Sequence, residues 1–151
     1  MAVTAWWFAG AMKNLLDRTK NIDWDTNTIK VMLTTVTYVP NQDTHSVKSS
    51  VTNEVTGTGY VAGGTTLTTK SLTQATNVYT LDADDAVWAS STITARLAVM
   101  YDDSGATDAD KALLLWVDFG QNEVSSSGEF RIAWNASGIA TATATDATGF
   151  P

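Results

Sequence analysis

Aspartate is the residue type with the most evident chemical potential in this sequence, and it gathers at both ends of one strand-like segment. Asp82, Asp84 and Asp85 precede that segment, and a second group follows it, consisting of Asp102, Asp103, Asp108 and Asp110. Calcium takes six to eight oxygen ligands from a flexible loop, so the second group holds the candidate ligands for a cation. Its spacing does not match the EF-hand pattern. We therefore expect solvated turns at both places and predict neither a metal nor another cofactor.

The sequence supports neither a catalytic triad, because no Gly-x-Ser-x-Gly elbow accompanies its single histidine, nor a zinc site. His45 is the only histidine, and cysteine is absent. A catalytic triad needs a nucleophile, a base and an orienting carboxylate, whereas zinc needs three or four nitrogen or sulfur ligands. We expect His45 to lie exposed in a loop and Gly57, Gly59, Gly63 and Gly64 to serve turns and a bulge, because no lysine or helix completes a phosphate-binding loop. The prediction is a protein without enzymatic activity.

Composition limits the partners of the chain. The 151 residues carry a net charge of -7, and 44% of them are hydrophobic, which is enough for one domain with its own core. An acidic chain lacks the clustered lysine and arginine that nucleic-acid binding requires. The apolar N-terminal stretch AVTAWWFAGAM is shorter than the roughly 20 residues that span a bilayer. We therefore predict no nucleic-acid partner, no membrane anchor and synthesis in a cytoplasm.

Helical spacing is visible only in the first segment, TAWWFAGAMKNLLDRTKNID. Its apolar stripe predicts an amphipathic helix, packed either on its own domain or on a neighbouring subunit. Because aromatic residues are enriched in interface centres, three tryptophans near this helix favour a subunit contact. We accordingly divide the chain into a helical arm, residues 1–24, and a β domain, residues 25–151, which ends in a small-residue tail. The interface candidates are Trp6, Trp7, Phe8, Met12, Leu16 and Trp24.

The rest of the chain has strand character, because threonine is abundant and apolar residues alternate with polar ones. In the segment 93–101, Ile93, Leu97 and Val99 are expected to face a core, with Arg96 opposite and bonded to a neighbouring carboxylate. A long surface connection is expected after Pro40. Trp88, Trp116 and Trp134 fall within strand patterns and are expected in the core or on a sheet face. The expected strands are residues 29–39, 60–74, 77–84, 93–101, 112–120 and 128–135, with one more short strand before the tail.

Seven or eight strands without intervening helices exclude alternating strand and helix units and predict an antiparallel β-sandwich or barrel with one N-terminal α-helix. Several long blocks also resemble a family of small structural proteins of tailed bacteriophage virions. These blocks are VTNEVTGTGYVAGGTTLTTK, then LDADDAVWASSTITARLAVMYDDSGATDADKALLLWVDFG, and then GEFRIAWNASGI. The resemblance extends from Ile29 to Ile139, and the Trp-rich start resembles the family least.

The resemblance implies an assembly role in the virion without enzymatic activity, and it supplies no catalytic residues. The expected function is a capsid decoration, or cement, protein that binds the major capsid protein lattice as a homotrimer and stabilises the head. A tail or head-fibre component bound to other virion proteins remains open. A virion-surface module that binds or hydrolyses carbohydrate is a further alternative, because sixteen acidic residues and six tryptophans offer the side chains for it.

Overall fold

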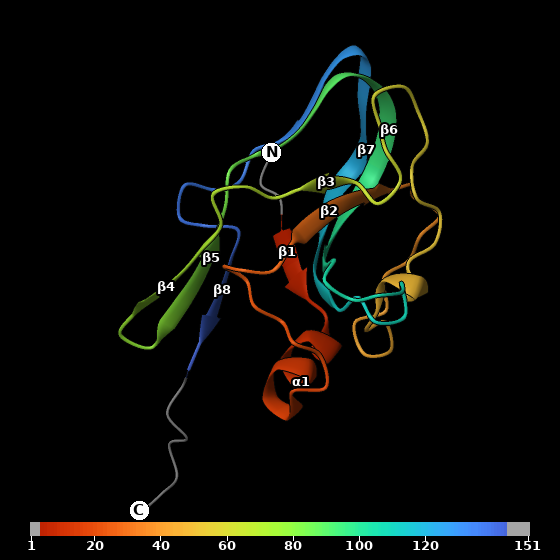
Figure 1. The fold of residues 1–151 in the computed structure, drawn as a ribbon. Coiled ribbons are helices and arrows are strands. Elements are labelled where there is room, and N and C mark those ends of the chain that lie inside the picture. Colours follow the sequence, from red (N-terminus) through yellow and green to blue (C-terminus); the bar gives the residue numbers. More distant parts are fainter. Residues whose placement is uncertain (1–3, 145–151) are drawn as a thin grey trace, which may run out of the picture.

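A computed structural model describes residues 4–144 of the protein, so residues 1–3 and the tail from residue 145 lie outside the described part. The fold is mainly β, with a single α-helix near the N-terminus among these residues, as the sequence predicts (Figure 1). The elements are β1 (Thr4–Trp7), α1 (Ala9–Asp17), β2 (Ile29–Thr34), a short 3-10 helix (Lys48–Ser50), β3 (Thr65–Thr66), β4 (Ser71–Ala75), β5 (Val78–Asp82), β6 (Ala86–Asp102), β7 (Leu113–Ile132) and β8 (Ala140–Thr143).

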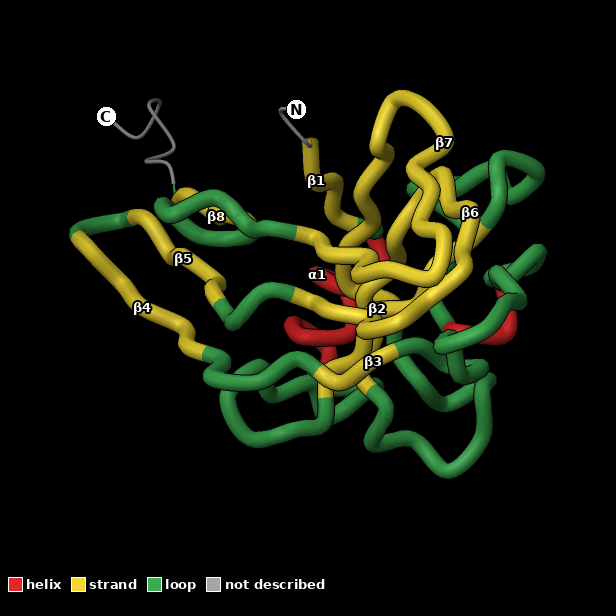
Figure 2. Tube along the Cα trace, turned by 90° about the horizontal axis from the view of Figure 1, so that it is seen from above, coloured by secondary structure: helices red, strands yellow, loops and turns green. Residues whose placement is uncertain are grey.

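The strands form two antiparallel sheets. The larger has the order β1-β7-β6-β2-β3 and the smaller the order β4-β5-β8. The smaller sheet lies to one side of the larger in both views (Figures 1 and 2). Every residue of β4 is exposed, whereas β5 contributes Leu81 to the main core. The smaller sheet is therefore attached through part of its surface and projects from the body.

β6 and β7 form a long two-stranded ribbon that bends over at its upper end in Figure 1. Four irregularities interrupt their pairing, and bulges of this kind bend a strand and increase its twist. The expected strands 112–120 and 128–135 are largely parts of the single strand β7, and the expected strand 93–101 lies within the longer β6. Between these two expected strands β7 continues without a break, and its residues 123–125 pair with residues 93–95 of β6.

The bulge at Arg96 changes which face of the sheet receives the side chains of β6. Ala95 pairs with Glu123, but Leu97 already pairs with Asp118. Ile93 therefore packs in the larger core, whereas Val99 packs in a second core on the opposite face. The expectation that Ile93 and Val99 share one face is wrong, because an unpaired residue in a strand reverses the alternation beyond it.

Apolar residues cover both faces of the larger sheet. One core contains Trp24, Trp88, Leu115 and Phe130 among its members, and the other is built around Phe8, Met32, Tyr38, Val99, Tyr101 and Leu113. Tyr38 belongs to the long connection after β2. Burial on both faces explains why the segments IKVML, LAVMY and LLLWV contain nearly uninterrupted apolar runs.

The connection of residues 35–64 lies tightly on the sheet, which explains its glycines. The Tyr60 hydroxyl donates a hydrogen bond to Glu54 (2.7 Å) and accepts one from the Leu33 amide (3.0 Å). Gly64 has φ +79°, and a Cβ there would lie 1.8 Å from the Val31 carbonyl oxygen. Only glycine fits such an approach in the left-handed region. The expected strand 29–39 accordingly ends at Thr34, and the expected strand 60–74 is reduced to β3 and the start of β4.

The N-terminal segment differs from the expected helical arm. Thr4–Trp7 forms β1, which pairs with Leu115–Asp118 of β7, so that only Ala9–Asp17 is helical. Phe8 is fully buried at the junction. Residues 4–24 thus contribute a strand and core side chains to the β domain, and the expected boundary at residue 24 does not separate two structural units among the described residues.

Candidate assembly surface

Four exposed apolar side chains lie on β1 and α1, and we call them the N-terminal apolar surface. Trp6 is 46% exposed and Leu16 is 85% exposed, while Met12 and Leu15 are also exposed. The spacing of Met12, Leu15 and Leu16 places them on one helix face. The buried helical residues are Ala11 and Asn14, so the expected apolar stripe, apart from Phe8 at its start, does not pack on the domain.

Trp6 is held in place by an aromatic neighbour. Its ring stacks on Trp116 of β7, with centroids 5.8 Å apart and planes 19° from parallel. Stacking of this kind orders a large side chain that remains partly accessible. The N-terminal apolar surface therefore includes a preformed indole, which loses little side-chain entropy when a partner covers it.

The other interface candidates are occupied within the chain. Phe8 and Trp24 are buried, and the Trp24 indole donates a hydrogen bond to the Asp82 carbonyl (3.3 Å). Trp7 is half-buried against the main core, and its indole lies 3.4 Å from the Thr141 carbonyl oxygen. Packing inside the domain accounts for these three aromatic residues, so the accessible candidates are Trp6, Met12 and Leu16.

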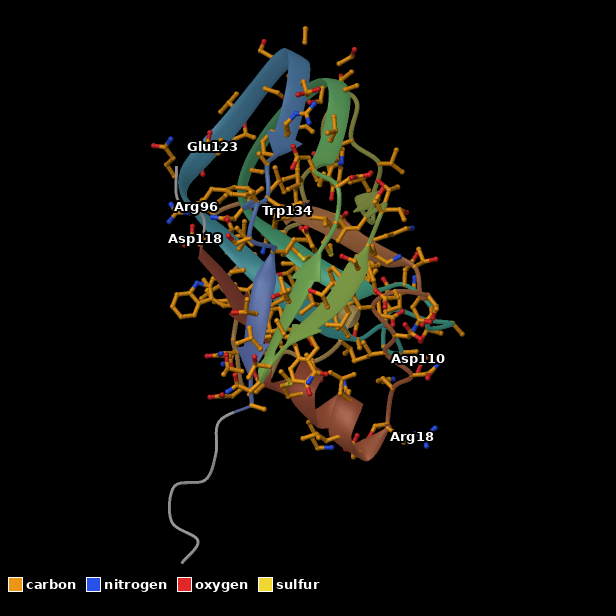
Figure 3. The ribbon with its side chains drawn as sticks, turned by 90° about the vertical axis from the view of Figure 1, so that its left-hand side faces the viewer. Arg18, Arg96, Asp110, Asp118, Glu123 and Trp134 are labelled. Carbon is orange, nitrogen blue, oxygen red and sulfur yellow. The ribbon has the colours of Figure 1, made fainter. Side chains whose placement is uncertain are left out.

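The charges on α1 leave one cation without an acidic partner. Lys13 pairs with Asp17 one turn later. Arg18, at the end of the helix beside Leu15, makes no ion pair within residues 4–144 (Figure 3). The N-terminal apolar surface is therefore bordered by an available guanidinium, although the chain as a whole is acidic.

The aspartates of the loop between β6 and β7 are bonded to lysines. Asp103 accepts bonds from Lys30 (2.8 Å) and Lys111 (2.9 Å), while Asp108 bonds Lys48 (2.7 Å). Burial raises the pKa of Asp103, but the two lysines outweigh it and hold this pKa below its ordinary value. The hydrogen bond from Lys48 likewise lowers the pKa of Asp108. The lysines therefore supply the positive charge that a bound cation would otherwise bring to these aspartates.

The remaining two candidate ligands have partners of their own. Asp102 is 2% exposed and accepts bonds from the Asn27 side chain (2.6 Å) and the Ser104 amide (2.9 Å). Asp110 accepts a bond from the Thr107 hydroxyl (2.7 Å), which lowers its pKa, as does Lys20. Within residues 4–144 no three His, Cys, Asp or Glu side chains gather in a group that could hold a metal ion.

The first aspartate group stabilises the turn before β6. Asp84 accepts bonds from the hydroxyls of Thr68 and Thr69, while Asp85 bonds the Trp134 amide (3.0 Å) and Arg131 (3.1 Å). A hollow of about 460 Å³ opens beside this group and is lined by these two aspartates, Arg131 and Trp134. Here several carboxylates face a single cation.

His45 is less exposed than expected. Its ring is half-buried and stacks on Tyr38, and its Nδ1 accepts a hydrogen bond from the Tyr38 hydroxyl (2.9 Å). The Asn41 amide also approaches Nδ1 (3.3 Å), so this nitrogen acts as an acceptor. Burial raises the pKa of Tyr38 to about 12, which keeps its hydroxyl protonated as the donor. The pair holds the connection closed over the second core.

An ion pair lies at the bulge beside Arg96. Asp118 accepts bonds from Arg96 Nε (2.6 Å) and Nη2 (3.3 Å) and from the Gly120 amide (2.7 Å). The bond from Arg96 lowers the pKa of Asp118. Gly120 adopts φ +78°. The sequence predicts a bond from Arg96 to a neighbouring carboxylate, and that carboxylate is Asp118. Gly120 within VDFGQN is the sequence signal for a bend beside Asp118.

Comparisons with known protein families, curated proteins and solved structures find no match to this chain. No helix among residues 4–144 has the length and apolar character needed to cross a membrane.

Proposed function

We propose that the protein is a non-enzymatic structural component of a tailed-bacteriophage virion, and specifically a decoration protein that binds the capsid lattice and stabilises the head. The observation that supports an assembly role is the N-terminal apolar surface: a stacked Trp6 on β1 and the exposed Met12, Leu15 and Leu16 on one face of α1. Groups of exposed apolar side chains commonly mark protein contacts. The virion context rests on the resemblance of the blocks between Ile29 and Ile139.

The proposed contact combines apolar burial with repetition. Burial of about 1,600 Å² in total is typical of a specific interface, and each Å² of apolar surface removed from water contributes about 25 cal/mol. A homotrimer that contacts the lattice at three points gains further through effective concentration. Arg18 at the border of the surface suits an acidic residue of the major capsid protein.

Purified particles of the phage that encodes the chain provide the first test. We expect hundreds of copies per particle by quantitative mass spectrometry, and cryo-electron microscopy should place the density on the head lattice. A handful of copies with density on the tail would replace the decoration role with a tail or fibre role. Absence of the protein from purified particles would overturn the virion proposal.

Point variants test the contact surface without removing β1, which belongs to the fold. Leu16→Glu should reduce binding to particles that lack the protein at least about tenfold, the effect of about 1.4 kcal/mol. Val61→Glu is the matched control. Val61 is also exposed, but it lies outside β1 and α1, in the connection where Thr58 pairs with Thr92 of β6. Equal binding by both variants would exclude the N-terminal apolar surface as the contact. Native mass spectrometry of the free protein tests the homotrimer.

A further inference from the structure

The bent part of β7 has one unpaired edge, which we call the β7 edge. β1 covers β7 only at Leu115–Asp118, and beyond that point β7 pairs with β6 alone among the described residues. An edge strand of this kind presents N–H and C=O groups that can bond a further strand. The β7 edge therefore offers main-chain bonding groups most regularly at residues 123–125, which pair with β6 on their other side, whereas residues 119–122 bulge out of the ladder.

A groove of about 340 Å³, lined by both apolar and charged residues, lies along the bent part of β7. All its lining residues lie between 119 and 133, on β7 and just after it, and none belongs to β6. The buried rings of Phe119 and Phe130, with centroids 6.1 Å apart, lie in its lining. Val124 also lines it and is 66% exposed. The groove suits an apolar side chain of a strand laid along the edge.

The charges around the groove favour a partner strand whose side chains are positively charged. Glu123 and Glu129 line the groove itself, and the adjoining hollow adds three aspartates through the shared residue Arg131. The groove and the hollow are together lined by five carboxylates and one guanidinium. That guanidinium belongs to Arg131, which already bonds Glu129 (2.7 Å) and Asp85. Glu123 makes no ion pair within residues 4–144 and projects from the outer side of the ribbon (Figure 3).

We propose that the β7 edge binds an extended segment of a partner protein in which basic residues alternate with apolar ones. The partner segment adds a strand to β7, inserts an apolar side chain above Phe119 and Phe130, and places its cations near Glu123 and the adjoining aspartates. A second copy of this chain fits less well, because pairing two such edges would bring acidic groups together in a protein of net charge -7. The inference concerns the isolated protein and does not depend on the virion proposal.

A peptide titration of the full-length protein tests the inference. The probe is the capped hexapeptide Lys-Val-Lys-Val-Lys-Val, and the controls are Glu-Val-Glu-Val-Glu-Val and a basic peptide that is N-methylated at alternate residues. Amide NMR shifts and slowed hydrogen exchange should appear at residues 119–126 with the basic probe only. Equal binding of the acidic or the methylated peptide would overturn the proposal, as would protection of the exposed strand β4 instead.

A variant pair separates a specific edge from general attraction to an acidic protein. Glu123→Gln should weaken binding of the basic probe about twofold to fivefold, the range expected for loss of one partly exposed charge pair. Asp43→Asn removes a charge from the connection after β2 and should leave the affinity unchanged. An equal loss in both variants would overturn the proposal, as would protection of residues 119–126 by self-association without peptide.

Discussion

Both ends of the β6–β7 ribbon are rich in acidic residues, but the structures around those residues differ. At the lower end in Figure 1, the loop between the strands carries aspartates that are bonded to Lys20, Lys30, Lys48 and Lys111, and both faces of the sheet are buried. At the bent end, carboxylates outnumber cations and one strand edge is unpaired. The difference shows that acidic residues have opposite roles depending on whether the topology brings lysines to them.

Truncation of an apolar side chain should give the largest difference in stability between the two ends. Leu113→Ala at the buried end should lower the free energy of unfolding by about 2–5 kcal/mol, because Leu113 is fully buried and its removal leaves a cavity. Val124→Ala at the bent end should change it by less than about 0.5 kcal/mol, because Val124 is mostly exposed. Urea unfolding followed by tryptophan fluorescence measures both; similar losses would contradict the contrast.

Removal of one cation from each end should give a smaller difference of the same sign. Lys111 bridges Asp103 and Asp108, so Lys111→Met leaves partly buried carboxylates with fewer partners and should cost about 1–2 kcal/mol. Arg131→Met removes an exposed cation whose ion pairs are screened by water and salt, so it should lower the free energy of unfolding less than Lys111→Met does. Thermal unfolding at low and moderate salt is the measurement. A larger effect at Arg131 would reverse the comparison.

Acid should weaken the lysine-bonded end through Asp103. The pKa of this carboxyl is lowered in the folded protein, so its contribution is complete above the unfolded pKa and is lost as the pH falls through the folded value. Asp103→Asn should therefore reduce the loss of stability between pH 7 and pH 3 by less than about 1 kcal/mol. Asp43→Asn is the control. An unchanged pH profile in the Asp103 variant would show that the lysine bonds add no stability.

The sequence predicted those strands in which burial determines the pattern of apolar residues. Alternation along 93–101 and the apolar run from Ala112 to Gly120 indicated strands correctly, because one or both faces of these segments are covered. The strand β1 was missed because AWW fits helical and strand spacing equally well. Its conformation is decided by pairing with β7, more than a hundred residues later. Local spacing contains no information about such a partner.

The lysine–aspartate pairs and the bulge at Arg96 could not be predicted for a related reason, because both depend on residues that are distant in the sequence. Lys20, Lys30, Lys48 and Lys111 are spread along the chain, and only the folded topology brings them to one loop. The spacing of the aspartates was visible, but their partners were not. The reversal at Arg96 similarly depends on four residues of β7 that are unmatched in β6. Among the interface candidates, exposure separates Leu16 from Trp24, a distinction that hydrophobicity alone cannot make.

The pairing of β1 with β7 has a consequence for the order of events during synthesis. Thr4 pairs with Asp118, so β1 is synthesised more than a hundred residues before its partner and completes its ladder only after β7 has left the ribosome. At about 5–20 residues per second this delay lasts several seconds or more. Trp6 and Trp7 have no β7 ladder during that interval. The nascent chain should therefore be more prone to aggregation before residue 118 emerges, and a ribosome-associated chaperone that holds β1 should raise the yield of folded protein.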